Sequence, residues 1–222
     1  AGQATNSGAH DTALTLLERA LARHGVDVWA ADYDFALRAH QLLCQVYALT
    51  GNAERSRAVG AVVLDQARTV LDKLPVHTVQ IAARTAAMDL VGAVEEAVAA
   101  ARLVEVELVA INGPHEIPER MTALIGRLGS PVPQGLLDPT PLDDPTRRAL
   151  QRVLTSALPA AAMSESPYYL PLLFRLVLDV VENGATDMVA TVAAQYGVFL
   201  SMAGLVDQGY AFTIISDFDV RI

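Results

Sequence analysis

The sequence predicts an all-α protein built as an array of antiparallel helical hairpins. Apolar residues recur every three or four positions along nearly the whole chain of 222 residues, which is the helical period. Apolar residues make up 52% of the chain but aromatic residues only 5%, and Ala, Leu and Val supply most of that content. The 11 Pro and 14 Gly are bunched in a few places. Because Ala and Leu have the highest helix propensities, closely packed helices joined by short turns are expected.

Five helices are expected in the first half of the chain. The first begins after Asp11, whose side chain can accept hydrogen bonds from backbone N–H groups of a first turn. Four more are predicted over residues 32–49, 53–71, 76–88 and 90–108. Gly51, between the second and third helices, can adopt the positive φ of a tight turn. Pro75 is expected to open the fourth helix, since a missing N–H is tolerated in a first turn.

Residues 112–144 are expected to link two sets of hairpins. They contain a short amphipathic helix over 119–128 and then a loop with four prolines. Asp144 and Pro145 signal a new helix, an N-cap residue followed by Pro at the first helical position. Helices are then predicted over 145–163, 167–182, 186–203 and 206–219. The expected organisation is hairpins over 1–111, a linker over 112–144 and hairpins over 145–222, packed as one continuous array.

Charge and hydropathy restrict the partners. The formal net charge is −9 at pH 7, and no run of Lys and Arg occurs. Because an acidic surface repels phosphate groups, nucleic acids and anionic membranes are not expected as partners. The most apolar stretch, residues 168–181, contains Arg175 and Asp179 and is shorter than the roughly 20 residues that span a bilayer, so membrane insertion is not expected. Cys44 is the only cysteine and no signal-peptide pattern is present, which favours the cytoplasm.

No catalytic, cofactor-binding or metal-binding motif is found. The sequence lacks both the phosphate-binding Gly-x4-Gly-Lys-Ser/Thr loop and the Gly-x-Ser-x-Gly nucleophile elbow. His40 and Cys44 lie four apart on one helix, but no third ligand accompanies them, so packing or solvent-facing roles are expected. Asp143 and Asp144 could be paired catalytic carboxylates, but a helix cap beside Pro145 explains them better. The neighbouring Glu95–Glu96 pair is expected on a solvated helix face.

Small residues recur where the helices of a tetratricopeptide-type repeat would cross. Such a repeat pairs two helices in about 34 residues, with Gly between them and small residues at the crossing. Ala13, Ser56, Ala93 and Gly209 occupy equivalent positions, although their intervals are irregular. The pattern predicts a degenerate tetratricopeptide-like array that winds as a right-handed superhelix. A generic Ala-rich helical bundle is the alternative.

The repeat register also predicts a binding surface. In the unit over residues 38–63, Arg38, Gln41 and Gln45 lie on one stripe of the first helix, because residues three and four apart share a helix face. That face lines the concave groove of such arrays, where side chains hydrogen-bond extended peptides. These three residues are the candidate partner-binding residues; an exposed polar stripe without a ligand is the alternative.

Several stretches resemble one protein family in the order in which they occur. They are Leu71–Val76 at the end of the third helix, Ala93–Leu108, Leu137–Pro145, Leu154–Ala161 and Tyr169–Leu173. They are similar to the tetratricopeptide-like helical region of very large bacterial signalling proteins. Those proteins carry a serine/threonine-kinase-like domain, an AAA-type signal-transduction ATPase, a GAF domain and an output such as a histidine kinase. The kinase and ATPase motifs lie in those other domains, so the resemblance assigns no catalytic residue to this chain.

The resemblance implies a non-catalytic scaffold or sensor segment between the ATPase and the output domains. Its partners would be other domains of the same polypeptide, or a protein or peptide. The chain does not begin with Met and ends without a helix-stop signal, which suggests a segment of a longer protein. The alternatives are a stand-alone peptide-binding adaptor and an all-α enzyme whose site is assembled from scattered residues.

Overall fold

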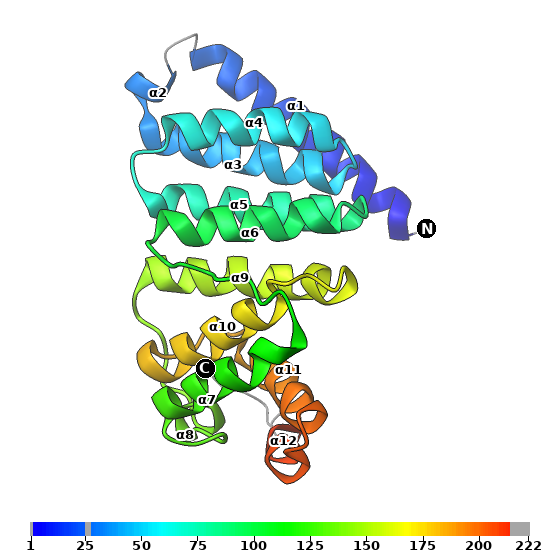
Figure 1. Cartoon of the computed structure of the whole chain (residues 1–222). Coiled ribbons are helices and arrows are strands. Elements are labelled where there is room, and N and C mark those ends of the chain that lie inside the picture. The colour runs from blue at the N-terminus through cyan, green and yellow to red at the C-terminus, as the bar shows by residue number, and fades with distance from the viewer. Residues whose placement is uncertain (1, 25–27, 214–222) are drawn as a thin grey trace.

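The part of the chain that the structure describes is built from helices joined by loops, as the sequence predicts (Figure 1). A computed structural model describes residues 2–24 and 28–213. Within these ranges the only β-type pairing is an isolated bridge between Pro141 and Ala185. None of the helices in these ranges is long and apolar enough to cross a membrane.

Thirteen helical elements follow one another in the described residues. They are α1 (Gly2–His24), α2 (Val28–Ala31), α3 (Tyr33–Leu49), α4 (Ala53–Gln66), α5 (Val70–Ala86), α6 (Leu90–Leu103), the 3-10 helix η1 (Pro114–Glu116), α7 (Ile117–Leu128), α8 (Gln134–Leu137), α9 (Pro145–Met163), α10 (Tyr169–Asn183), α11 (Val189–Met202) and α12 (Val206–Thr213).

The long helices stack as hairpins. The pairs α3/α4, α5/α6 and α9/α10 each pack together, and α3 contacts α5, which in turn contacts α9. The second helix of one hairpin contacts the first of the next, as α4 does α5 and α6 does α9. Figure 1 shows these hairpins as successive layers, with α1 lying across the α3/α4 layer. Because α9 follows α6 in the stack, α7 and α8 lie outside it, against α10.

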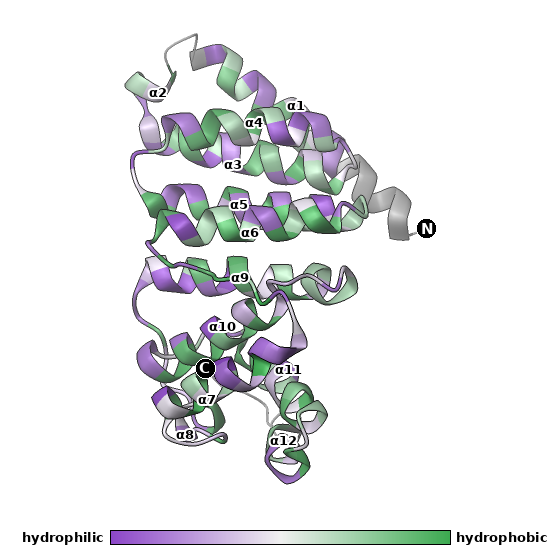
Figure 2. Cartoon of the chain, in the orientation of Figure 1, coloured by the Kyte–Doolittle hydropathy of each residue, from purple (hydrophilic) through white to green (hydrophobic). Residues whose placement is uncertain are grey.

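Amphipathic helices and small residues build the core. Hydrophobic and hydrophilic residues alternate along the stacked helices in Figure 2, so each helix buries one face. The main cluster of buried apolar residues extends from α5 to α12, and a smaller one lies between α3, α4 and α5. In α6, Ala93, Ala97 and Ala100 are fully buried. Alanine at these positions allows α6 to pack closely between its neighbours.

The boundary between the third and fourth predicted helices is wrong. The helix expected over 53–71 ends at Gln66, and α5 already begins at Val70. Thr69 and Asp72 explain this start: the Thr69 side chain accepts from Asp72 N, and the Asp72 carboxylate accepts from Thr69 N, which forms a capping box. The Leu71–Val76 stretch therefore belongs to the start of α5, and Pro75 lies inside that helix instead of opening it.

Two other predicted helix ends also differ. Asp11 lies inside α1 and is not its N-cap. The helix expected over 90–108 ends at Leu103, and Glu105 has a φ of +58°, in the left-handed region that stops a helix. Residues 106–112 then form no helix. The linker loop contains the short helix α8, and the end expected for the last helix, residue 219, lies outside the described residues.

Candidate functional site

The three residues predicted to bind a partner line one groove. Arg38, Gln41 and Gln45 lie on α3 and border a cavity of about 280 Å³ between α3 and α5. Arg38 and Gln45 are exposed, and Gln41 is half-buried. The remaining lining is apolar and consists of Leu42, Pro75, Val76 and Val79. The groove therefore combines an apolar wall with a polar rim that can donate hydrogen bonds.

Pro75 and Gln41 shape this groove together. Pro75 has no N–H to donate to the carbonyl four residues earlier, so this turn of α5 lacks one backbone hydrogen bond. Gln41 Nε2 donates to the carbonyl oxygen of Asp72, in the same turn, at 2.8 Å. One predicted binding residue thus joins α3 to α5, which leaves Arg38 and Gln45 to meet a ligand. Arg38 Nε donates at 3.2 Å to Asp34 O within its own helix.

His40 and Cys44 turn to different partners. His40 Nδ1 lies 2.7 Å from Ala36 O, and the imidazole packs 4.9 Å from the ring of Trp29. Cys44 is fully buried, and its Sγ donates to Ser56 O at 3.4 Å. Nowhere in residues 2–24 and 28–213 do three or more His, Cys, Asp or Glu side chains gather as a metal site would require.

The Cys44 side chain belongs to a seam of buried polar residues between α3, α4 and α5. Ser56 Oγ donates to Cys44 O at 2.9 Å, and Gln80 Nε2 donates to Ser56 Oγ at 3.1 Å. A Cβ on Gly60 would lie 3.1 Å from Gln80 Nε2, so a small residue is needed at this crossing. Burial raises the pKa of the Cys44 thiol. A protonated, enclosed thiol is a poor nucleophile, so the seam has a structural role.

The expectation of a solvated face for Glu95 and Glu96 is wrong for Glu96. Glu95 is exposed, but the Glu96 side chain is 17% exposed and its Oε1 lies 2.7 Å from His77 Nδ1. Arg84 Nε lies 3.7 Å from the other Glu96 oxygen, and Arg84 also binds Asp89. Glu96 is thus paired with α5, whereas its neighbour Glu95 points to solvent, because adjacent residues lie on different sides of a helix.

Asp144 is confirmed as a helix cap. Its Oδ1 accepts from Thr146 N at 2.8 Å and from Arg147 N at 3.1 Å, and α9 begins at Pro145. Asp143 is exposed. Asp144 therefore has the capping role that the sequence predicts.

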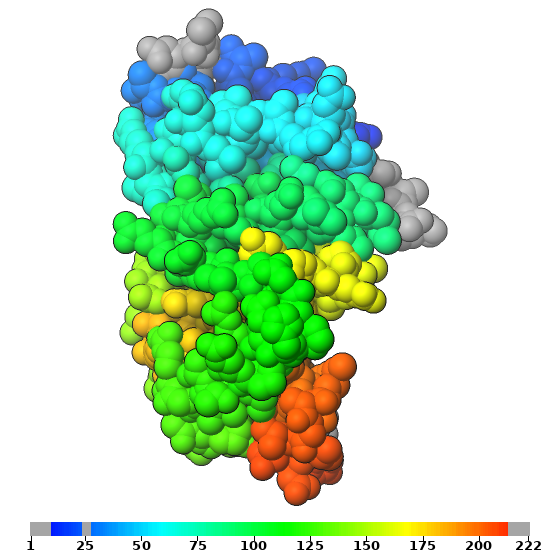
Figure 3. Space-filling model, in the orientation of Figure 1, coloured from blue at the N-terminus to red at the C-terminus, as the bar shows by residue number. Residues whose placement is uncertain are grey.

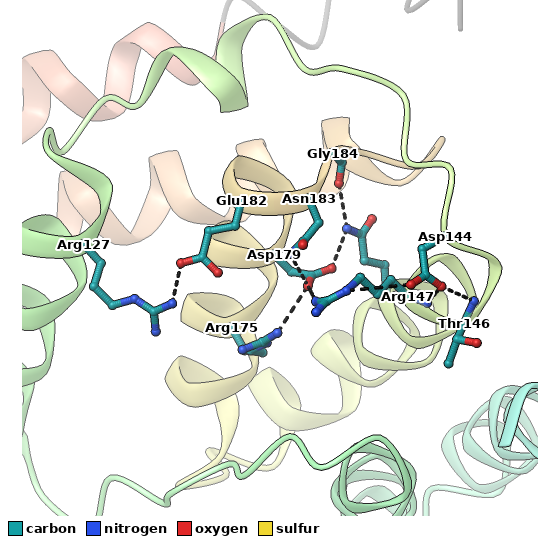
Figure 4. A network of polar contacts seen from close by, with 10 residues as sticks. Arg127, Asp144, Thr146, Arg147, Arg175, Asp179, Glu182, Asn183 and Gly184 are labelled. Atoms are coloured by element: carbon teal, nitrogen blue, oxygen red, sulfur yellow. Dashed lines mark hydrogen bonds and ion pairs between the residues drawn. The ribbon is translucent and has the colours of Figure 1, made fainter.

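The most extensive polar network surrounds Asp179, which the sequence analysis did not single out as a site. Four donors converge on this carboxylate, which is 2% exposed (Figure 4). Arg147 and Arg175 lie 2.9 and 3.3 Å from Oδ1. The other two donors are amides: Asn183 Nδ2 reaches Oδ1 at 3.0 Å and Gln151 Nε2 reaches Oδ2 at 2.8 Å. Three donors thus converge on Oδ1 and one on Oδ2, all from within the protein, which favours a structural role that joins α9 to α10.

Another hollow is mostly apolar and lies at the other end of the stack. Two adjoining cavities, of about 680 and 580 Å³, share Pro114, Ile117, Tyr169 and Leu170 as lining. The second cavity also borders Met202, which is 84% exposed. Tyr169 donates to Gln195 Oε1 at 2.7 Å, and burial raises the pKa of its hydroxyl. Glu165 lines the first cavity, and the shared lining holds no carboxylate, amine or imidazole group.

Comparison with known proteins finds no relative. No protein-family model, no curated protein and no solved structure matches this chain.

Proposed function

We propose that the chain is a non-catalytic protein-interaction and scaffold segment, folded as a tetratricopeptide-like right-handed superhelix. Its place would be in a bacterial signal-transduction ATPase or sensor kinase in the cytoplasm, between the ATPase and output domains. The groove between α3 and α5 would hold an extended peptide, or a segment of a neighbouring domain of the same polypeptide. A stand-alone peptide-binding adaptor is the second candidate, and the same groove would serve it.

The order of helix contacts supports the array. The first helices of three hairpins, α3, α5 and α9, lie next to one another, and each second helix packs on the following hairpin. Such stacking joins each unit to its neighbours only and leaves one long surface lined by first helices. This surface suits a rigid spacer between domains.

The lining of the α3/α5 groove is the observation that carries the binding proposal. Arg38 and Gln45 are exposed beside an apolar wall of α5. Gln45 can donate to and accept from a peptide backbone, and Arg38 can pair with a carboxylate. The wall can cover an apolar side chain of the same ligand. An extended segment needs these three kinds of contact.

Selection from a peptide library on the purified chain tests the binding proposal. Arg38→Ala and Gln45→Ala should each weaken the selected peptides about fivefold or more in fluorescence anisotropy, with unfolding unchanged. Arg57→Ala removes the same charge from an exposed site on α4 and is the matched control. Peptides that bind equally well to all variants would place the ligand elsewhere.

The reading frame around this segment tests the signalling context. Kinase-like, ATPase or GAF sequences in the same frame would support the scaffold segment. A frame without them would favour the adaptor.

A further inference from the structure

A second groove, unlike the first, runs beside the segment that follows α6. Residues 107–111 form one wall, α7 forms the other, and Pro171, Phe174 and Leu178 of α10 lie between them around a cavity of about 270 Å³. The space-filling view shows α10 at the bottom of a hollow between two parts of the surface from the middle of the chain (Figure 3). The groove has an apolar floor, because Phe174 and Leu178 are each only 8% exposed.

The wall formed by residues 107–111 carries unpaired backbone. Neither the N–H groups of Glu107, Leu108, Val109 and Ala110 nor their carbonyls hydrogen-bond to another part of the described chain. The next residue, Ile111, donates to Pro167 O at 2.9 Å and fixes the end of the segment. Exposure alternates along it: Glu107 and Val109 are exposed, whereas Leu108 and Ala110 are half-buried. This period of two is typical of a strand, and the free backbone groups of residues 107–110 are available to pair with one.

The other wall supplies positive charge. Arg120, Arg127 and Arg175 line the groove and only Glu107 opposes them, although the whole chain has a net charge of −9. Arg127 is paired with Glu182 and Arg175 with Asp179. Arg120 has no ion pair or hydrogen bond within residues 2–24 and 28–213. This half-buried guanidinium is therefore available to an acidic ligand beside the apolar floor.

We propose that this groove binds an extended strand of a partner protein in which apolar residues alternate with acidic ones. The strand pairs with the free backbone groups of residues 107–110, as in β-strand addition to a sheet edge. Its apolar side chains cover Phe174 and Leu178, and an acidic side chain binds Arg120. A basic strand would place its positive charges beside the unpaired Arg120, and an apolar strand would leave Arg120 unpaired.

The site is independent of the α3/α5 groove, because the two grooves share no residue. Loss of binding at one groove therefore leaves binding at the other measurable. Arg38→Ala should not change binding to this second groove.

A designed peptide tests the proposal on the whole chain. The probe is a fluorescein-labelled strand of sequence Val-Asp-Val-Asp-Leu-Asp-Val, compared with the same strand carrying Lys for Asp. Arg120→Ala should weaken the acidic strand about tenfold, since a charge-assisted hydrogen bond is lost. Arg57→Ala, which removes the same charge from an exposed position on α4, should have no effect. The Lys strand should not bind.

Hydrogen exchange separates strand pairing from simple apolar contact. At saturation, the amides of residues 107–110 should exchange at least about tenfold more slowly. A strand N-methylated at alternate residues should lose binding, since it cannot donate along one edge. The proposal is overturned by any of three results: no binding of the acidic strand at about 1 mM, equal binding of the Lys or N-methylated strand, or binding without slower exchange at residues 107–110. Dimerisation of the chain that requires Arg120 would also overturn it, by assigning the groove to a second copy.

Discussion

Replacing Asp179 by Ala should destabilise the chain by about 2–3 kcal/mol. Removing one partner of a buried ion pair costs roughly 3–5 kcal/mol, because the opposite charge is left uncompensated. Here the arginine side chains keep contact with water, 41% exposed for Arg147 and 22% for Arg175, so the cost is reduced. Gln151 also keeps its second acceptor, Gly184 O, at 2.9 Å. The remaining cost comes from desolvated donors that lose their shared carboxylate.

Urea denaturation followed by far-ultraviolet circular dichroism measures this change, and thermal unfolding gives a second value. For a chain of this size, about 2–3 kcal/mol corresponds to a lowering of Tm by roughly 4–12 °C. Asp187→Ala is the matched control, since Asp187 is 67% exposed and pairs with Arg152, which is 53% exposed. That exposed pair should contribute less than about 0.5 kcal/mol. If Asp179→Ala were as mild as its control, the network would not hold α9 and α10 together.

Three further predictions concern packing, pH and reactivity. Gly209→Ala should destabilise the chain by about 2 kcal/mol or more, because the new Cβ would lie 2.5 Å from Gly197 O. Gly126→Ala, in open space on α7, should instead stabilise it by about 0.5–1 kcal/mol. The urea midpoints of the two variants compare these effects. Burial raises the pKa of Tyr196 to about 12, so the folded state holds this proton more tightly than the unfolded state does. The contribution of this proton to the free energy of unfolding, up to about 3 kcal/mol, is complete below pH 10 and is lost between about pH 10 and 12. Phenolate absorbance and unfolding midpoints measured over this range check it. Cys44 should react with a thiol reagent only at the rate at which the α3/α4 hairpin opens; fast labelling without denaturant would contradict its burial.

Local signals predict some helices well and misplace others. The helix over 145–163 is found at its predicted bounds, because Asp144 and Pro145 together form a strong start signal. Pro75 alone suggests a later helix start, but the Thr69–Asp72 capping box sets the start of α5 at Val70. Residues 104–108 fit both a helical and a period-two pattern; the left-handed Glu105 ends the helix, and periodicity alone does not reveal this.

Sites that depend on tertiary contacts are harder to predict. The spacing of Arg38, Gln41 and Gln45 placed them on one face, but the α5 wall opposite them follows only from the stacking. In the sequence, Asp179 only interrupts an apolar stretch, and nothing near it in the chain indicates a buried network. Its partner Gln151 is 28 positions away, and no spacing rule connects residues so distant.

Arg175 connects the stability of the stack with the proposed strand-binding groove. The same guanidinium binds the buried Asp179 and lines the cavity beside residues 107–111. While Asp179 holds it, most of its charge is used within the protein, and Arg120 remains as the cation for a ligand. Loss of Asp179 would release Arg175 toward the groove while it loosens α9 from α10. Acidic-strand binding would then strengthen as stability falls, opposite to the loss that simple misfolding would cause. Arg120 is therefore the residue whose replacement separates recognition from folding, since nothing else in the described ranges is paired with it.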